Sequence, residues 1–286
     1  MARILETRWY PHDLSLDEDI AVIGDVHGMT EPLGSLLDHL DDVRVIQLGD
    51  LIDRGPDSLG SVRTGWERIH LQGGILLPGN HEGLLFEALA HLDRPKVTGD
   101  GTSWHGFADP IDAWLSNGGG SMLKEIDLYG TLSPQDGLRA IRAALPSGYE
   151  AWLRSAPSHH RCGEILVVHA GVHHKAKDPE GWLAQPLTLD AANSSSPHHD
   201  HWAWIRGDWA AWAEGWTRYN ARAVIHGHTA PWTRSFEDGS ELSTHLDKLG
   251  TVGRINVDGG SYRNGTVAAV HLRKGEYRFL GAVRGL

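Results

Sequence analysis

The sequence predicts an α/β fold in which two packed mixed sheets are flanked by helices. The first observation is that short apolar runs alternate with amphipathic stretches in the N-terminal part, as in repeated strand–helix units. The second is that further apolar runs, some of them separated by glycines, return in the second half of the chain. No fixed-period repeat and no linker divides the 286 residues, so we expect one domain over residues 1–286.

Three strand–helix pairs are expected in the N-terminal part. Each apolar run there ends in glycine, which is typical of a short buried strand that leads into a turn. The expected strands cover residues 20–24, 43–49 and 74–79. The helices that follow them cover residues 30–40, 58–70 and 83–92. Thr30 precedes a proline and a leucine-rich pattern, so we expect it to be the N-cap of the first helix.

The rest of the chain is less regular. We expect a loop or insertion at 93–120, interrupted by a short helix at 110–115, and then helices at 133–145 and 147–157. Residues 175–201 are polar and rich in Ser, Pro and His, which predicts a long loop. Further strands are expected at 164–171, at 221–228 and in the glycine-punctuated C-terminal part.

Composition excludes several classes of protein. The formal net charge of -11 argues against a broad nucleic-acid or anionic-membrane surface, because phosphate groups select basic faces. The one cysteine, Cys162, permits no disulfide within the chain and no cysteine-based zinc site. The N-terminus has no apolar stretch of signal-peptide length, and no apolar run reaches the ~18 residues of a membrane span. We therefore expect a cytoplasmic protein without nucleic-acid or membrane partners.

Side chains of the kinds that bind metals follow five of the expected strands. Because the carboxyl ends of parallel strands meet in one crevice, we expect these side chains to lie together. They are Asp25, His27, Asp50, Asn80, His169 and His228. Oxygen and imidazole ligands without a thiolate suit Mn, Fe or Zn. Six ligands suit two ions that share a carboxylate, and a pair of ions about 3.5–4 Å apart can clamp the attacking and leaving oxygens of a phosphoryl displacement.

Five motifs in this chain resemble those of the phosphoprotein phosphatase branch of the calcineurin-like metallophosphoesterases. They occur in the family's order, and one more segment, NVDGGS at 256–261, resembles the closing segment of bacterial members. The five are GDVHG at 24–28, GDLIDRG at 49–55, GNHE at 79–82, HAG at 169–171 and GHT at 227–229. Five motifs in order are far more specific than any one of them. The resemblance implies a four-layer αββα sandwich.

The resemblance also implies how the metal ligands are divided. The first ion would be held by Asp25, His27 and Asp50. The second ion would be held by Asp50, Asn80, His169 and His228, so that Asp50 bridges the two. A water or hydroxide between the ions would be the nucleophile, because two cations lower its pKa.

Three neighbouring residues would act on the substrate. His81 would protonate the leaving group, Asp53 would orient His81, and Arg54 would bind phosphate oxygens. In eukaryotic-type members an arginine precedes GNHE, but this chain has Pro78 there. Arg206, in a Trp-x-Arg pattern similar to that of bacterial members, is therefore expected to supply a second guanidinium. The alternatives are a buried Asp53–His81 ion pair that only shapes the turn, and a surface or helix-capping role for Arg206.

The leading functional prediction is a phosphatase with two divalent metal ions, Mn first, with Fe and Zn as alternatives. Its substrate would be a phosphorylated protein or peptide, or a small phosphoester, as for the bacterial serine/threonine protein phosphatases of this family. GNHE rather than GNHD, and Asp53 before Arg54, favour this over a symmetrical dinucleoside tetraphosphate hydrolase. A third possibility, a metal- or phosphate-binding module without turnover, is disfavoured by the intact His81 and Asp53. The sequence leaves open the oligomeric state and the role of segment 197–216.

Overall fold

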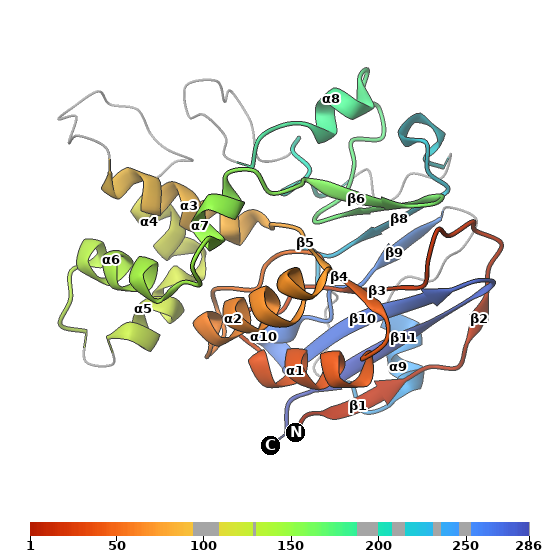
Figure 1. Ribbon diagram of the computed structural model, residues 1–286, viewed down its shortest axis with the longest axis horizontal. Helices are drawn as coiled ribbons and strands as arrows, with labels where there is room; N and C mark the ends of the chain where they lie inside the picture. The colour runs from red at the N-terminus through yellow and green to blue at the C-terminus, as the bar shows by residue number, and fades with distance from the viewer. Residues whose placement is uncertain are drawn as a thin grey trace.

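Two β-sheets form the centre of the fold, with helices around them (Figure 1). The structure, a computed structural model, describes residues 1–93, 109–127, 130–187, 200–207, 215–230, 236–245 and 253–285. The first sheet has seven strands, ordered β1-β11-β10-β3-β4-β5, with β2 paired to β11. They are β1 (Arg3–Glu6), β2 (Tyr10–Pro11), β3 (Ile20–Ile23), β4 (Arg44–Gln47), β5 (Ile75–Leu76), β10 (Thr266–Arg273) and β11 (Glu276–Val283). β3, β4 and β5 are parallel to one another, whereas β3 is antiparallel to β10, so the sheet is mixed.

The second sheet has four strands and is also mixed. They are β6 (His159–Cys162), β7 (Ile165–Val168), β8 (Ala223–His226) and β9 (Arg254–Asn256). β6 is antiparallel to β7, whereas β7, β8 and β9 are parallel. Every residue of β3, β7 and β8 is buried, as expected for aliphatic strands covered on both faces.

Alternating side chains of one strand supply two separate cores. Ile20 and Val22 of β3 lie in the core between the two sheets, together with apolar residues of β7 and β8. Ala21 and Ile23 lie in a second core, with apolar residues of α1 (Thr30–His39) and α2 (Ser58–Arg68). Because successive side chains of a strand point to opposite faces, this pattern places helices outside the first sheet and the second sheet inside.

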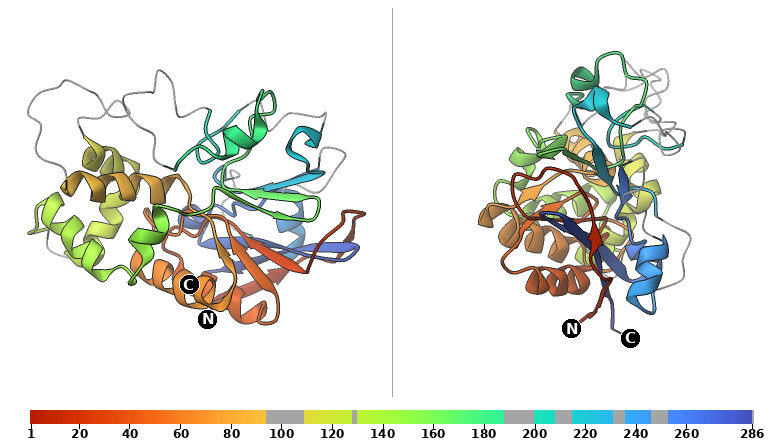
Figure 2. Two further views of the ribbon diagram at one scale, coloured as in Figure 1. Left: turned by 45° about the horizontal axis from the view of Figure 1, so that its top comes forward. Right: turned by 90° about the vertical axis from the view of Figure 1, so that its right-hand side faces the viewer.

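The remaining helices cover the ends and the outer faces. A group of helices lies beside both sheets, on the left-hand side of Figure 1 and of the left view in Figure 2. It consists of α3 (Asn80–Leu92), α4 (Pro110–Trp114), α5 (Gly120–Ile126), α6 (Pro134–Ala144) and α7 (Tyr149–Leu153). α8 (Pro179–Leu183) packs with Trp202 and Trp216 on the outer side of the second sheet. α9 (Gly239–His245) contacts β1 and β11, and α10 (Ser261–Asn264) precedes β10. The predicted fold class, two mixed sheets flanked by helices, is confirmed.

Several predicted boundaries were wrong for local reasons. Thr30 is the first residue of α1 and not its N-cap, because its Oγ1 donates to the carbonyl of Asp57 and Met29 takes the cap position. α3 begins at Asn80 rather than at Gly83, so GNHE forms the start of the helix. The chain passes from α4 into α5 through residues 115–119, with a kink at Gly118 (φ 120°), where a loop was expected.

Other differences concern elements that the sequence pattern did not indicate. α8 lies within the expected loop at 175–201, and β1, β2 and β6 were not expected. Parts of the expected loops, at 94–108 and 188–199, lie outside the described residues. In the part of the chain that the structure describes, no helix combines the length and the apolar character needed to cross a bilayer.

Candidate metal centre

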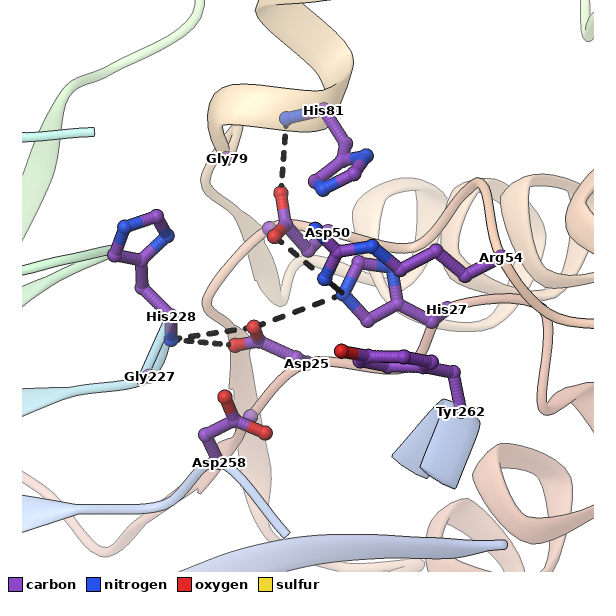
Figure 3. Close-up of polar contacts among 12 residues, drawn as sticks. Asp25, His27, Asp50, Arg54, Gly79, His81, Gly227, His228, Asp258 and Tyr262 are labelled. Atoms are coloured by element: carbon purple, nitrogen blue, oxygen red, sulfur yellow. Dashed lines mark hydrogen bonds and ion pairs between the residues drawn. The ribbon is translucent and has the colours of Figure 1, made fainter. Parts of the chain in front are cut away.

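Residues that follow five strands meet where the carboxyl ends of both sheets come together, and Figure 3 labels four of them, Asp25, His27, Asp50 and His228. They are Asp25 and His27 after β3, Asp50 after β4, Asn80 after β5, His169 after β7 and His228 after β8. All six side chains are buried. The strands belong to two different sheets, so the site lies where the parallel parts of both sheets end and not in the crevice of one sheet.

The Asp50 carboxylate lies at the centre of this group. Its Oδ2 is 3.7 Å from His27 Nε2 and 3.5 Å from His169 Nε2. Beyond these imidazoles, Asp25 Oδ2 is 4.0 Å from His27 Nε2, and Asn80 Oδ1 is 3.1 Å from His169 Nε2. One carboxylate therefore stands between two sets of nitrogen and oxygen atoms, as a ligand shared by two ions would.

Two groups of three side chains have ligand atoms that all lie within 4.8 Å of one another. One group is His27, Asp50 and His81, and the other is Asp50, His169 and His228. Asp50 belongs to both groups. The first group contains His81, whereas Asp25 was the expected third ligand beside His27 and Asp50. Both Asp25 and His81 are therefore candidates for this third ligand.

The imidazoles are oriented so that one nitrogen of each faces the site. His27 Nδ1 lies 2.8 Å from the carbonyl oxygen of Ile52, and His169 Nδ1 lies 2.7 Å from that of Leu48. Each Nδ1 must carry the proton to donate to a carbonyl, which leaves Nε2 as a potential metal ligand. Such a backbone contact behind a ligand is typical of metal sites.

Two buried nitrogen atoms test whether the site fits a bound group. His228 Nε2 and His81 Nε2 are shielded from solvent and have no hydrogen-bond partner among the residues that the structure describes. A buried polar atom without a partner is costly, so such atoms call for an explanation. A bound cation or a substrate oxygen would supply the missing partners. The residues of the site therefore fit the divalent metal ions of a two-metal phosphoesterase centre.

The charges of the site point the same way. Burial raises the pKa of Asp25 well above its usual range, and the nearby carboxylates of Asp258 and Asp50 raise it further. Burial would also raise the pKa of Asp50, but the adjacent imidazoles bring this pKa well below its usual range, and His169 has the largest lowering effect. The same contact raises the pKa of His169 to about 9, although burial opposes it. Three carboxylates in one buried site are an electrostatic cost that cations would remove.

Backbone strain is concentrated here. In the described part of the chain, six non-glycine residues have positive φ, and five of them belong to the site or its flanking turn. They are His27, Asp50, Asp53, Arg54 and His228, with φ values between 45° and 68°. The left-handed region is costly for residues with a Cβ atom, and such strain accumulates at functional sites.

The GNHE segment joins two of the turns. The Glu82 carboxylate accepts hydrogen bonds from the backbone N–H groups of Asp50, Leu51 and Gly79 at 2.7–2.8 Å. The backbone N–H of His81 donates to Asp50 Oδ1 at 3.0 Å. Glu82 is thus the buried acceptor that holds the turn after β4 against the start of α3, and it fixes Asp50 relative to its neighbours.

Asp53 and His81 form a buried pair. His81 Nδ1 is 2.7 Å from Asp53 Oδ2, and neither side chain is exposed to solvent. The other carboxylate oxygen, Oδ1, accepts a hydrogen bond from the indole Nε1 of Trp114 at 3.0 Å. Trp114 comes from α4 and belongs to none of the five motifs, so the sequence alone did not identify it.

Arg54 lies at the edge of the same group (Figure 3). Its guanidinium carbon is 4.7 Å from the centre of the Tyr262 ring, and Nη1 is 3.1 Å from His27 Nε2. Tyr262 also makes an edge contact with the His27 ring, at 5.2 Å between ring centres. Tyr262 of α10 and Asp258 just before it were not identified as site residues from the sequence.

Arg206 is less firmly held than the other predicted residues. It is exposed, and its Nη1 donates to Thr229 Oγ1, in the GHT motif, at 3.3 Å. Although the residue as a whole is exposed, partial burial of the guanidinium lowers its pKa, and the carboxylates of Asp25, Asp50 and Asp258 act against this shift.

The chain is similar in sequence to proteins that are already known. The model of the calcineurin-like phosphoesterase family matches residues 19–231. The chain is 27% identical over 227 residues to the asymmetrical bis(5'-nucleosyl)-tetraphosphatase PrpE of Bacillus cereus, covering 73% of this chain and 77% of that protein.

Two solved structures are also similar. One, described as a candidate diadenosine tetraphosphatase, has a TM-score of 0.47 and 17% identity, and covers 96% of this chain and 100% of that one. The other is a serine/threonine phosphatase from Saccharomyces cerevisiae with similarity to a human phosphatase, with a TM-score of 0.47, 14% identity and coverage of 95% and 82%.

Proposed function

Because the chain belongs to the calcineurin-like phosphoesterase family, we propose that it hydrolyses phosphomonoesters at a centre of two divalent metal ions. The observation that carries the proposal is the position of Asp50, whose carboxylate is shared by two groups of buried ligand atoms. Asp25, His27 and Asp50 would hold one ion. The second would be held by Asp50, Asn80, His169 and His228. When bound, such a pair lowers the pKa of coordinated water and neutralises the charge of the phosphoryl group.

The residues around the ligands would handle the proton of the leaving group. His81 Nδ1 is occupied by Asp53, while its Nε2 is buried, without a partner among the described residues, and close to His27 and Asp50. His81 can therefore present the Nε2 proton to the ester oxygen as the P–O bond breaks. Asp53 would fix the imidazole and stabilise its positive charge, as a carboxylate does behind a catalytic histidine.

Two guanidinium groups would bind the phosphate. Arg54 is held over the Tyr262 ring beside His27, and Arg206 is exposed next to Thr229. Planar guanidinium groups bind phosphate oxygens through paired hydrogen bonds. Manganese is the proposed ion, because the ligand set contains oxygen and imidazole but no sulfur.

A second candidate is hydrolysis of a dinucleoside tetraphosphate, and the PrpE relatives favour it by their name. The products separate the two modes of cleavage. Symmetrical cleavage of diadenosine tetraphosphate gives two molecules of ADP, whereas asymmetrical cleavage gives AMP and ATP. Phosphomonoester hydrolysis instead releases inorganic phosphate.

The test is a side-by-side comparison of rates on one metal-loaded preparation. Phosphoserine and phosphothreonine peptides, p-nitrophenyl phosphate and diadenosine tetraphosphate would be assayed with Mn²⁺ and again with chelator. We expect release of inorganic phosphate from the monoesters at a higher kcat/KM than cleavage of the tetraphosphate. A preference for the tetraphosphate would make the second candidate the function of this chain.

A further inference from the structure

The hydrogen bonds of Asp53 extend beyond the family motifs to a residue of the helical group. Trp114 is fully buried, and its indole N–H is the only described side-chain donor, besides His81, to the Asp53 carboxylate. One carboxylate oxygen therefore faces the imidazole at 2.7 Å and the other faces the indole at 3.0 Å. With a donor on each oxygen, the carboxylate cannot rotate without losing a hydrogen bond.

The segment that carries Trp114 also forms hydrogen bonds with the backbone that follows Asp53. The backbone N–H of Arg54 donates to the carbonyl of Gly118 at 3.2 Å. The Glu125 carboxylate accepts from the N–H groups of Ser58 and Leu59 at 2.6 and 2.9 Å. The segment from α4 to α5 thus holds the chain at Arg54 and at the start of α2. Its Trp114 indole also donates to the carboxylate of Asp53, the residue before Arg54.

The backbone of this segment is shaped around the indole. A Cβ atom on Gly119 would lie 2.2 Å from Cε2 of Trp114 and 2.5 Å from its Nε1. Gly119 has an ordinary helical φ of -59°, so its conformation does not require glycine. Contact with the indole ring is what excludes a side chain there. The next residue, Gly120, also has a φ of -59°, and a Cβ atom on it would meet nothing within 4 Å.

We propose that Trp114 is a positioning residue for proton donation by His81. Its indole N–H fixes the rotation of the Asp53 carboxylate, so that Oδ2 stays on His81 Nδ1 and the imidazole keeps Nε2 toward the leaving oxygen. In the step, a water oxygen forms a new bond to phosphorus, the ester oxygen takes the electron pair of the breaking P–O bond, and the proton moves from His81 Nε2 to that ester oxygen. The inference rests on the role proposed for His81.

Trp114→Phe removes the donor and retains an apolar ring. The matched control is Trp216→Phe, because Trp216 is equally buried and its Nε1 donates to a backbone carbonyl, that of Gly253, at 3.0 Å. A second pair changes no polar group at all. Gly119→Ala pushes against the indole, whereas Gly120→Ala adds the same methyl group to open space. Gly120→Ala also controls for the effect of alanine on the helix.

Kinetics on two monoesters give the first result. We expect Trp114→Phe and Gly119→Ala to lower kcat on a phosphoserine peptide by about 10-fold or more, the scale of one hydrogen bond to a charged group. KM, metal content and the rate on p-nitrophenyl phosphate should change little, since nitrophenolate leaves with little help. Both control variants should match the unmodified protein. Equal losses on the two esters, or equal losses in the controls, would overturn the inference.

The imidazole itself gives a second result that does not depend on the substrate. In the unmodified protein, ¹⁵N NMR of His81, assigned with His81→Asn, should show a single form with the proton on Nδ1 when the ring is neutral. Trp114→Phe and Gly119→Ala should show a mixture of tautomers. If the His81 signals do not change, Trp114 has only a packing role. A protein without monoesterase activity but with this NMR difference would count against the proposed function and for the inference.

Discussion

His81 Nδ1 lies 2.7 Å from Asp53 Oδ2 inside a region that excludes solvent from both side chains. The same His81 is close enough to His27 and Asp50 to join a metal-binding group. The two possibilities make different demands on the residue. A proton donor must be close to the leaving oxygen, whereas a ligand must remain attached to an ion throughout the reaction.

His81→Asn separates these roles. We expect a loss on phosphoserine peptides of about 10²–10⁴-fold, the usual contribution of general acid–base catalysis. The loss on p-nitrophenyl phosphate should be much smaller, and two ions should still be bound. Asp53→Asn should follow the same pattern more mildly, because the imidazole remains. Loss of an ion in His81→Asn, measured by metal analysis, would make His81 a ligand.

Arg206 should contribute to phosphate binding, since Pro78 offers no charge. Arg206→Ala should weaken competitive inhibition by inorganic phosphate while the metal content stays the same. A charge-assisted contact is worth about 1.5–3 kcal/mol, and exposure to solvent reduces this toward about 1 kcal/mol. We therefore expect a rise in the inhibition constant of roughly fivefold. Arg222→Ala is the control, because Arg222 is an exposed arginine paired with Asp13. Equal effects of the two variants would leave Arg206 with a surface role.

Asp50→Asn should damage both halves of the metal centre together. A carboxamide keeps the size of the side chain but loses the charge that two ions would share. We expect both ions to bind more weakly in calorimetric titrations, with the loss of activity following the loss of metal. Asn80→Ala is the comparison, since the Asn80 side chain contacts His169, with 3.1 Å between Oδ1 and Nε2. If Asp50→Asn weakens one ion only, the carboxylate does not bridge.

The metal-free protein should lose stability as the pH rises from 7 to 9. Contact with Asp50 raises the pKa of folded His169 to about 9 against burial, whereas an unfolded histidine has a pKa of about 6.5. Between these values the folded state binds more protons, so the free energy of unfolding falls with rising pH. Urea midpoints of the chelated protein would measure this.

Metal binding should reverse this dependence. His169 must lose its proton to bind an ion, so the stabilisation by Mn²⁺ should grow as the pH rises. His169→Gln should flatten the pH dependence of the metal-free protein between pH 7 and 9. A urea midpoint that is constant over this range in the chelated unmodified protein would contradict the proton assignment.

The strands were predictable where an apolar run is closely followed by glycine. β3, β4, β7 and β8 have this pattern. β6, with the sequence HHRC, is followed by Gly163 but is not apolar, and its antiparallel pairing with β7 forms it. The start of α5 was missed because SNGGGS reads as a loop. Glycine is required at position 119 because the Trp114 indole leaves no room for a side chain there. This is a tertiary contact that the local sequence pattern does not indicate.

The residues of the site that directly follow strands could be predicted from the sequence. Residues such as Asp25 and His169 follow apolar runs directly, and the fold brings the strand ends together. Trp114 and Tyr262 reach the site from helices without such a signal. Only the packing of those helices against the turn after β4 places them there, so the sequence alone could not identify them.

The most direct test of the central claim is metal replacement, with bound ions and phosphatase activity measured on the same samples. Protein stripped by chelation would be titrated with Mn²⁺, and metal content would be read by elemental analysis. We expect no activity in the stripped protein, and recovery that is complete when two ions are bound per chain. Full activity with p-nitrophenyl phosphate in a sample verified to contain no metal would contradict the account.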